Sequence, residues 1–400
     1  MARPTTMEMR VVISVSDTQA QKLIEPHAVP PSVRAQMWAI PLVTLSFAIV
    51  FTVLVAMLWP MSRYETAPGR ADLVAPRLSI SGTEGEVYEP TEGIRFVTAL
   101  GSELRPLQAF MGWVDPVVNV LTCEERFGDC DPQTSREVQL GAMATAKEFA
   151  SYVALDYLGF ETSLNEGPAQ VAGFDEQLCP ADASANRACK VLAVGDTITG
   201  IDAGDGMVDI TVVTQLSKAL ADSAPGDVVT LTVLPIGETD PSSAKNVSVE
   251  LMASPDDATR TIIGFNARDT RTVDLPFSID IDTDRIGGPS AGLAFTLALI
   301  DELSPGDLVP DLGVAVTGTI AEDGTVGAIG ALLQKANAVK KSGAKIFLVP
   351  TAQGPDDIAA AQASVGDAVE LVPVATLDEA IAALVGRGGT PPIRGPDCGV

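Results

Sequence analysis

The sequence predicts a mixed α/β (α+β) fold that follows a single N-terminal transmembrane helix. A stretch without charged residues runs from Trp38 to Trp59. An alternating strand pattern at 277–281 leads into a helical pattern at 291–303, and apolar runs at 346–349 and 371–374 predict further buried strands. A chain of 400 residues is long enough for two or three domains, each with its own core.

Composition limits the classes of partner. The net charge is −26 and the isoelectric point is about 4.3. Such an acidic chain is a poor match for nucleic acid, so we expect no nucleic-acid partner. An acidic surface suits a soluble domain outside the cytoplasm.

The N-terminal segment predicts a membrane anchor. We expect residues 1–36 to be a cytoplasmic tail and residues 37–60 to cross the membrane once. At about 1.5 Å per residue, the uncharged stretch spans roughly the 30 Å hydrocarbon layer, and a tryptophan at each end suits the interface. The rival reading, a cleaved signal peptide, requires a shorter apolar run. The long acidic region that follows favours a cytoplasmic N-terminus and an extracytoplasmic remainder in the cell membrane.

Residues 61–159 form an N-terminal extracytoplasmic region of small, mixed α/β character. Its early part is rich in proline and glycine and reads as a spacer. A long helix is expected from Pro132 to Leu158, because Asp131-Pro132 is a good start and Gly159 is a good stop.

The chain has five cysteines, and all lie after the apolar segment. In an oxidising compartment, Cys123 with Cys130 and Cys179 with Cys189 are candidates for local disulfides, which leaves Cys398 unpaired. Free thiols are the alternative reading. No cysteine spacing indicates a metal site.

Residues 160–237 resemble a PDZ domain. The similar parts are the turn and strand at 190–198, a short helix at 213–221, and Pro225-Gly226-Asp227 before a strand at 228–234. The resemblance implies a groove that takes an extended peptide as an added strand, with a carboxylate-binding loop near Gly167. The partners it implies are protein or peptide substrates, recognised through their C-terminal tails.

A glycine-rich loop at residues 284–293 joins the predicted strand and helix. Gly287 and Gly288 let the backbone bend and let a substrate approach closely. Ser290 lies where the loop becomes a helix N-terminus, and backbone N–H groups there can bind a developing oxyanion. Ser290 is therefore a candidate nucleophile, and an ordinary helix N-cap is the alternative.

The base for such a serine must be a lysine. The only histidine, His27, precedes the apolar segment, which excludes Ser-His-Asp chemistry and His-based zinc sites on the far side of a membrane. The candidate is Lys335, which opens a second helix among apolar neighbours such as Ile329, Leu332 and Ala336. An exposed helix lysine is the alternative. Neighbouring acids, including Glu322, are expected to be solvated turn residues.

These motifs together resemble the proteolytic domain of Lon proteases. Gly-Pro-Ser-Ala-Gly at 288–292, with Gly288, Pro289 and Ser290, matches the serine motif of that family. Thr317-Gly318 and the stretch that ends at Lys335 match its lysine region. The resemblance covers residues 245–386, with residues 387–400 expected to be a disordered tail.

The resemblance implies a Ser-Lys dyad with Thr317 beside it and with supporting roles for residues 287–289. Gly287 and Thr319 depart from ATP-dependent members, which carry acids at both positions. Together with the absence of a Walker motif in these 400 residues, this suggests the membrane-anchored, ATP-independent branch with a PDZ domain. No cofactor or metal is expected. A homo-oligomer, often a hexamer in this family, is also implied.

Two alternatives to a protease remain. One is a membrane-tethered PDZ adaptor whose protease domain is inactive, which the departures at Gly287 and Thr319 would fit. The other is a scaffold built on the acidic region, which would bind partners without turnover.

Overall fold

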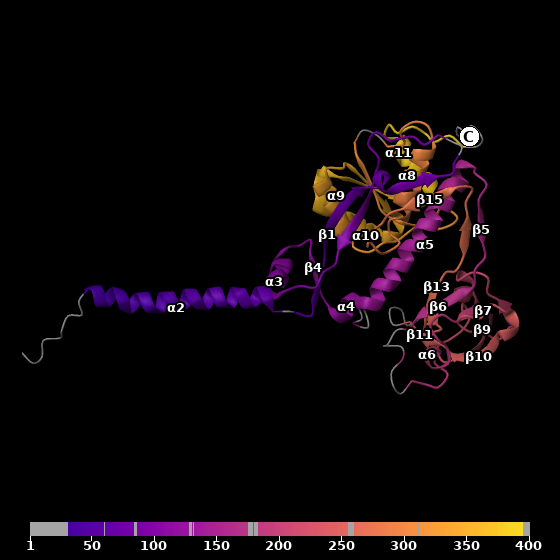
Figure 1. The fold of residues 1–400 in the computed structure, drawn as a ribbon, viewed down its shortest axis with the longest axis horizontal. Coiled ribbons are helices and arrows are strands. Elements are labelled where there is room, and N and C mark those ends of the chain that lie inside the picture. The colour runs from indigo at the N-terminus through magenta and orange to yellow at the C-terminus, as the bar shows by residue number, and fades with distance from the viewer. Residues whose placement is uncertain are drawn as a thin grey trace, which may run out of the picture. The chain divides into compact units, whose positions relative to one another are not determined.

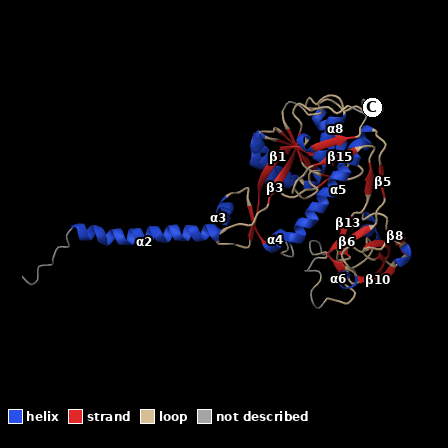
Figure 2. Ribbon diagram, in the orientation of Figure 1, coloured by secondary structure: helices blue, strands red, loops and turns tan. Residues whose placement is uncertain are grey.

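A computed structural model describes residues 31–59, 61–83, 86–127, 130, 132–174, 179, 183–254, 260–309 and 312–394. The chain divides into two compact units, residues 1–59 and 60–400, and each is described by itself (Figure 1). The predicted mixed α/β class is confirmed, because helices and strands alternate through the second unit (Figure 2).

The first unit contains helix α2, Pro31–Leu58. Its segment Ala39–Leu58 is long and apolar enough to cross a membrane, and it is not buried against other parts of the unit. The helix begins within the expected tail, so residues 31–36 are helical. Residues 1–30, including His27, lie outside the described part of the chain.

A six-stranded sheet forms the centre of the second unit within the part of the chain that the structure describes. Its strand order is β20-β19-β16-β3-β1-β4. Strands β3, β16, β19 and β20 run parallel to one another. Strand β1 is antiparallel to both β3 and β4. The bounds are β1 Arg63–Leu73, β3 Ile94–Leu100, β4 Asn119–Thr122, β16 Val314–Val316, β19 Ile346–Pro350 and β20 Glu370–Val374.

Side chains alternate between the two faces of this sheet, as strand geometry requires. Ile346 and Leu348 join one buried cluster, and Phe347 and Val349 join another on the opposite face. Helices α5, α8 and α11 contribute to the first cluster, and α9 and α10 contribute to the second. These helices are α5 Pro132–Leu158, α8 Gly292–Leu303, α9 Leu332–Ser342, α10 Pro355–Val365 and α11 Leu377–Val385.

The remaining elements of this part are short. Strand β2 pairs with β15, and the two strands β17 and β18 form a hairpin beside α8. Helices α3 and α4 flank β4. The bounds are β2 Leu78–Ser81, β15 Ser278–Ile281, β17 Thr319–Ile320, β18 Val326–Gly327, α3 Pro106–Val114 and α4 Cys123–Phe127.

A second sheet has the order β10-β9-β7-β6-β13, and β8 pairs with β7. Its apolar face packs with helices α6 and α7 in a separate buried cluster. The bounds are β6 Ala169–Gly173, β7 Thr197–Asp202, β8 Met207–Asp209, β9 Val228–Leu234, β10 Lys245–Glu250, β13 Asn266–Arg268, α6 Ala188–Val191 and α7 Thr214–Ala219. We call this sheet with its two helices the PDZ-like part. Small pairs link or border it: β5 Ser163–Asn165 with β14 Thr272–Asp274, and β11 Met252–Ala253 with β12 Thr261–Ile262.

The sheets correct the expected domain boundaries. Residues 61–159 are not a separate region, because β1, β3 and β4 complete the sheet that holds β16. Nor does the last domain start at residue 245, because β10 pairs along its whole length with β9. Alternating valines in β10 are typical of a strand, but alternation carries no information about which sheet a strand joins. The PDZ-like part therefore interrupts the larger fold between α5 and β15.

The expected disordered tail is also corrected in part. The Thr390 N–H donates to Asp307 O at 2.7 Å, and the Ile393 N–H donates to Ser304 Oγ at 2.8 Å. Arg394 pairs with Asp378 and lies over the ring of Tyr157. Residues 387–394 are thus held against the fold, while residues 395–400, including Cys398, lie outside the described part.

Two disulfides are present in the structure. Cys123 is joined to Cys130 at the start of α4, and Cys179 is joined to Cys189 on α6. Residues 175–178 and 180–182 lie outside the described part of the chain, and the second disulfide connects Cys179, which lies between them, to α6 of the PDZ-like part.

Candidate active site

The glycine-rich loop runs between β15 and α8, and helix α5 supports it from behind. Gly288 has φ +92°, a left-handed conformation that favours glycine. Its N–H donates to Gln139 O on α5 at 2.7 Å. At Gly287, an added Cβ would lie 2.9 Å from Gln139 Cβ. The absence of an acid at Gly287 thus has a steric reason, because the approach of α5 leaves no room for a side chain.

Ser290 follows this loop, one residue before the N-cap of α8. The N-cap is Ala291, and no side chain caps the helix. The alternative in which Ser290 is an ordinary N-cap therefore does not describe this structure. The Ser290 carbonyl accepts from Gly318 N–H at 2.9 Å and from Thr317 Oγ1 at 3.1 Å, which fixes the serine against the strand end after β16.

Lys335 reaches the same point from the first turn of α9. Its Nζ lies 2.7 Å from Ser290 Oγ and 3.2 Å from Thr317 Oγ1. Lys335 is only 4% exposed, so the exposed-helix-lysine alternative does not hold either. Ser290, Thr317 and Lys335 are thus brought together from three separate elements.

Burial changes the acidity of this lysine. Desolvation disfavours the ammonium form and lowers the pKa of Lys335 from 10.5 to about 8. A lysine with this pKa is partly neutral near neutral pH and can accept a proton. The surrounding apolar side chains, including Ile329, Leu332 and Ala336, produce this environment.

A pocket of about 450 Å³ lies beside the serine. Its lining includes Pro289, Thr319 and Ile320, together with Phe149 of α5 and Val171 of β6. Thr319, one of the departures from the ATP-dependent pattern, therefore borders open space next to Ser290. The mainly apolar lining fits an extended peptide better than a small charged ligand.

Sequence reasoning missed Gln139 and Arg271, which support this site. Gln139 holds the glycine loop, and nothing in its helical context marks it. Glu322 is an exposed turn acid, as expected, and its Oε1 also accepts from Arg271 Nη1 at 2.8 Å, which the sequence did not indicate. Nothing in the sequence around Arg271 indicates its role, because its partner Glu322 is distant in sequence.

Among the residues that the structure describes, no group of three or more histidine, cysteine or acidic side chains is arranged to hold a metal ion. The chemistry that the described residues offer is that of the serine and the lysine.

Comparison with known families fits this geometry. Residues 283–387 match the family model of the Lon protease (S16) C-terminal proteolytic domain. That segment includes Ser290, Thr317 and Lys335. The resemblance to the Lon proteolytic domain is therefore confirmed for this segment.

Curated proteins give the same result. Lon protease of Neorickettsia sennetsu is 30% identical over 128 residues, which is 32% of this chain and 15% of that protein. Lon protease of Xanthomonas oryzae pv. oryzae is 34% identical over 110 residues, which is 28% of this chain and 13% of that protein. Lon protease of Chloroflexus aggregans is 34% identical over 103 residues, which is 26% of this chain and 12% of that protein. The chain thus matches only about an eighth of the length of these relatives.

A comparison with solved structures also gives a match. It is the PDZ domain of the SdrC-like protein Lmo2051 from Listeria monocytogenes, which is 18% identical, covers 26% of this chain and 87% of that chain, and has a TM-score of 0.19.

Proposed function

We propose that this chain is a serine endopeptidase in which Lys335 activates Ser290 by a Ser-Lys dyad. The observation that carries the proposal is the 2.7 Å separation of Lys335 Nζ and Ser290 Oγ in a buried environment. The match of residues 283–387 to a proteolytic domain supports the same reaction class.

The first half-reaction forms an acyl-enzyme. Neutral Lys335 accepts the proton of the Ser290 hydroxyl, and Oγ forms a bond to the scissile carbonyl carbon. The tetrahedral intermediate collapses when the C–N bond breaks, and the ammonium of Lys335 gives its proton to the leaving amine. Thr317 Oγ1 holds the Lys335 Nζ from the other side at 3.2 Å.

The oxyanion needs backbone donors at the helix start. Gly288 N–H is already bonded to Gln139 O, and Pro289 has no N–H. The N–H groups of Ser290 and Ala291 are therefore our candidates for the oxyanion hole. They precede α8, whose N-terminal dipole favours negative charge.

The second half-reaction consumes water. Lys335, again neutral, takes a proton from water, whose oxygen bonds to the acyl carbon as the bond to Ser290 Oγ breaks. The carboxylic acid product leaves, and the proton returns to Ser290. No nucleotide enters any step, so we propose hydrolysis that is independent of ATP.

The location and substrates form part of the same proposal. Helix α2 is consistent with a single membrane span. We propose that it anchors the chain in the cell membrane with its N-terminus inside, so that the catalytic domain acts on extracytoplasmic proteins. Two disulfides are consistent with an oxidising compartment. A homo-oligomer, such as a hexamer, is a further expectation from the family resemblance.

The test is hydrolysis of a loosely folded protein by the full chain in detergent without ATP, with Ser290→Ala and Lys335→Ala beside it. The proposal predicts cleavage by the wild type and background rates for both variants. Equal cleavage by wild type and variants would contradict it. An adaptor with an inactive protease domain, the alternative reading, predicts that Ser290→Ala changes no function.

A further inference from the structure

The peptide-binding edge of the PDZ-like part is occupied by the chain itself. Without β13, strand β6 would be an edge strand, and such an edge is where an extended peptide adds to a sheet. Strand β13 takes this place in antiparallel register, with Ala267 opposite Val171 and Arg268 opposite Gln170. We call residues 260–271, which contain β13, the internal strand.

The internal strand also fills the loop where a ligand's terminal carboxylate was expected. Thr270 Oγ1 donates to Pro168 O at 2.5 Å. A Cβ added to Gly167 would lie 2.3 Å from the backbone of Thr270. Only glycine permits this approach, so the loop before β6 is shaped around the chain's own segment.

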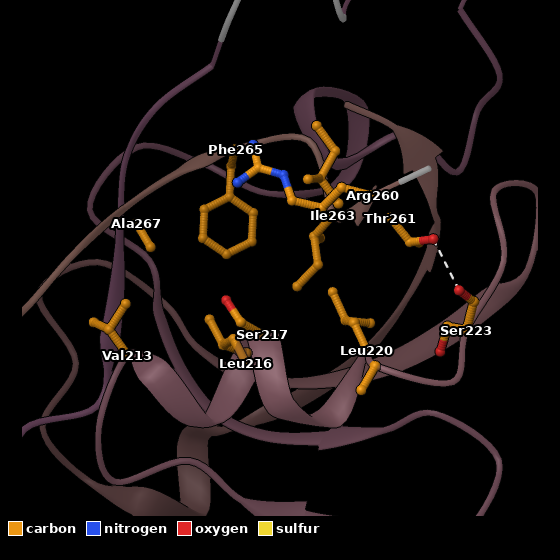
Figure 3. Close-up of a pocket in the computed structure, with 12 residues that line it drawn as sticks. Val213, Leu216, Ser217, Leu220, Ser223, Arg260, Thr261, Ile263, Phe265 and Ala267 are labelled. Carbon is orange, nitrogen blue, oxygen red and sulfur yellow. Dashed lines mark hydrogen bonds between the residues drawn. The ribbon is translucent and has the colours of Figure 1, made fainter. Parts of the chain in front are cut away.

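Helix α7 lies across from the internal strand. Between them is a pocket of about 520 Å³, in which Ile263 and Phe265 face Leu216 of α7 and Leu220, which follows the helix (Figure 3). Ile263 is buried, and Phe265 packs against the same cluster. The internal strand thus makes both kinds of contact that a bound peptide makes: backbone pairing with a strand and apolar contact beside a helix.

The far end of the internal strand is connected to the candidate active site through Arg271. Its guanidinium is 9% exposed, pairs with Asp269, and donates to Glu322 Oε1 at 2.8 Å. It also lies 4.8 Å from the ring centre of Phe149 on α5. A planar guanidinium held by two carboxylates and a ring has little freedom to move.

Glu322 belongs to the turn of the β17–β18 hairpin, which touches the dyad. At the start of this hairpin, Gly318 N–H donates to Ser290 O at 2.9 Å, and Gly318 O accepts from Leu293 N–H at 3.1 Å. Thr319 and Ile320 line the pocket beside the serine. The ion pair of Glu322 with Arg271 therefore restricts the movement of the β17–β18 hairpin, whose residues Thr319 and Ile320 line the pocket.

We propose that the internal strand is a built-in ligand of the PDZ-like groove, and that Arg271 at its end is a positioning residue that holds the β17–β18 hairpin against Ser290. The effect on turnover rests on the proposed serine peptidase function, but the docking of the strand does not. The dyad is assembled while the strand is docked, so the docked form is the competent one. A substrate tail can add to β6 only by displacing residues 266–268.

Docking is tested first by cross-linking in the full chain in detergent. The pair Gln170→Cys and Arg268→Cys joins directly opposed positions, and peptide mapping after mild oxidation is expected to find that disulfide. The control pair, Gln170→Cys with Ser248→Cys, lies three strands apart, about 14 Å, and is not expected to link. Failure of the first pair to link would overturn the built-in ligand.

Positioning is tested with Arg271→Met, Glu322→Gln and the double variant. Each single variant is expected to lower kcat roughly tenfold with little change in KM, as loss of a charge-assisted hydrogen bond predicts. The double variant is expected to lose no more than either single one, because both remove the same contact. Glu370→Gln, which breaks the ion pair with Arg387, is the matched control with unchanged kcat.

Unchanged kcat in both single variants, or losses that multiply to about a hundredfold, would overturn the positioning role. A purely structural Arg271 would lower thermal stability without lowering kcat. Hydrogen exchange of residues 319–327 is expected to accelerate in Arg271→Met, and this readout needs no hydrolysis. Unchanged exchange would count against positioning, whereas a wild type that neither cleaves peptides nor reacts with a fluorophosphonate would count against the peptidase proposal instead.

Discussion

Replacing Lys335 with methionine is expected to change hydrolysis and folding stability in opposite directions. A shift of the Lys335 pKa from 10.5 to about 8 means that burial disfavours the charged form. The difference corresponds to about 3 kcal/mol of unfolding free energy at pH 7, where the unfolded chain holds this proton more tightly. Methionine has a similar length and carries no charge, so this penalty disappears.

We therefore expect Lys335→Met to lose hydrolysis and yet to unfold at a temperature about 4 °C higher than wild type at pH 7. The sign follows from linkage. A depressed lysine pKa costs stability below about 8, and the cost fades as pH rises toward 10.5. The advantage of the variant should therefore shrink above pH 8. Thermal unfolding of the full chain in detergent, at pH 7 and pH 10, measures this.

A variant that is less stable than wild type at pH 7 would refute the reasoning. It would mean that the contacts of Nζ with Ser290 and Thr317 outweigh the cost of burying the amine. Lys340→Met, on the exposed side of the same helix, is the matched control and is expected to change the unfolding temperature little.

Other predictions follow from the same contacts. Hydrolysis by wild type should rise with pH and level off above about 8, because Lys335 must be neutral to act as a base, and a flat profile from pH 6 to 9 would contradict that role. Thr317→Val should lower kcat roughly tenfold, since Lys335 Nζ loses a partner, while Thr317→Ser should retain most activity. Burial raises the pKa of Asp301 to about 6, so the folded state loses stability as pH rises through 6 and this carboxyl becomes charged. In thermal melts, Asp301→Asn should therefore be more stable than wild type at pH 8 but not at pH 4. Reduction should expose four additional thiols to alkylation in intact-mass measurements, and unshifted counts would contradict both disulfides.

Local patterns in the sequence predicted the centre of the site. The glycine pair before Ser290 and the apolar neighbours of Lys335 are short-range features that made the two residues candidates, and the resemblance to the Lon proteolytic domain favoured the dyad over an N-cap serine and an exposed lysine. Helix α5 and strand β9 were predicted with the bounds that they have, because capping residues and turns mark their ends.

Long-range pairing could not be predicted in the same way. Alternation within a segment such as β10 is typical of a strand, but it does not indicate the partner strand. The place of β3 in the large sheet depends on pairs that lie more than two hundred residues apart, such as Ile94 with Val314, and β1 joins the sheet through β3. Arg271 and Gln139 became visible only when the fold brought them to Glu322 and Gly288.

The most direct test of the account is cleavage of an unfolded protein, without ATP, by the full chain beside Ser290→Ala and Lys335→Ala. Loss of either member of a serine dyad can cost on the order of 10⁶ in turnover, and the two losses do not add. The account predicts cleavage by wild type and the same background rate for both single variants and for the double variant. Wild-type rates in either variant would contradict the dyad.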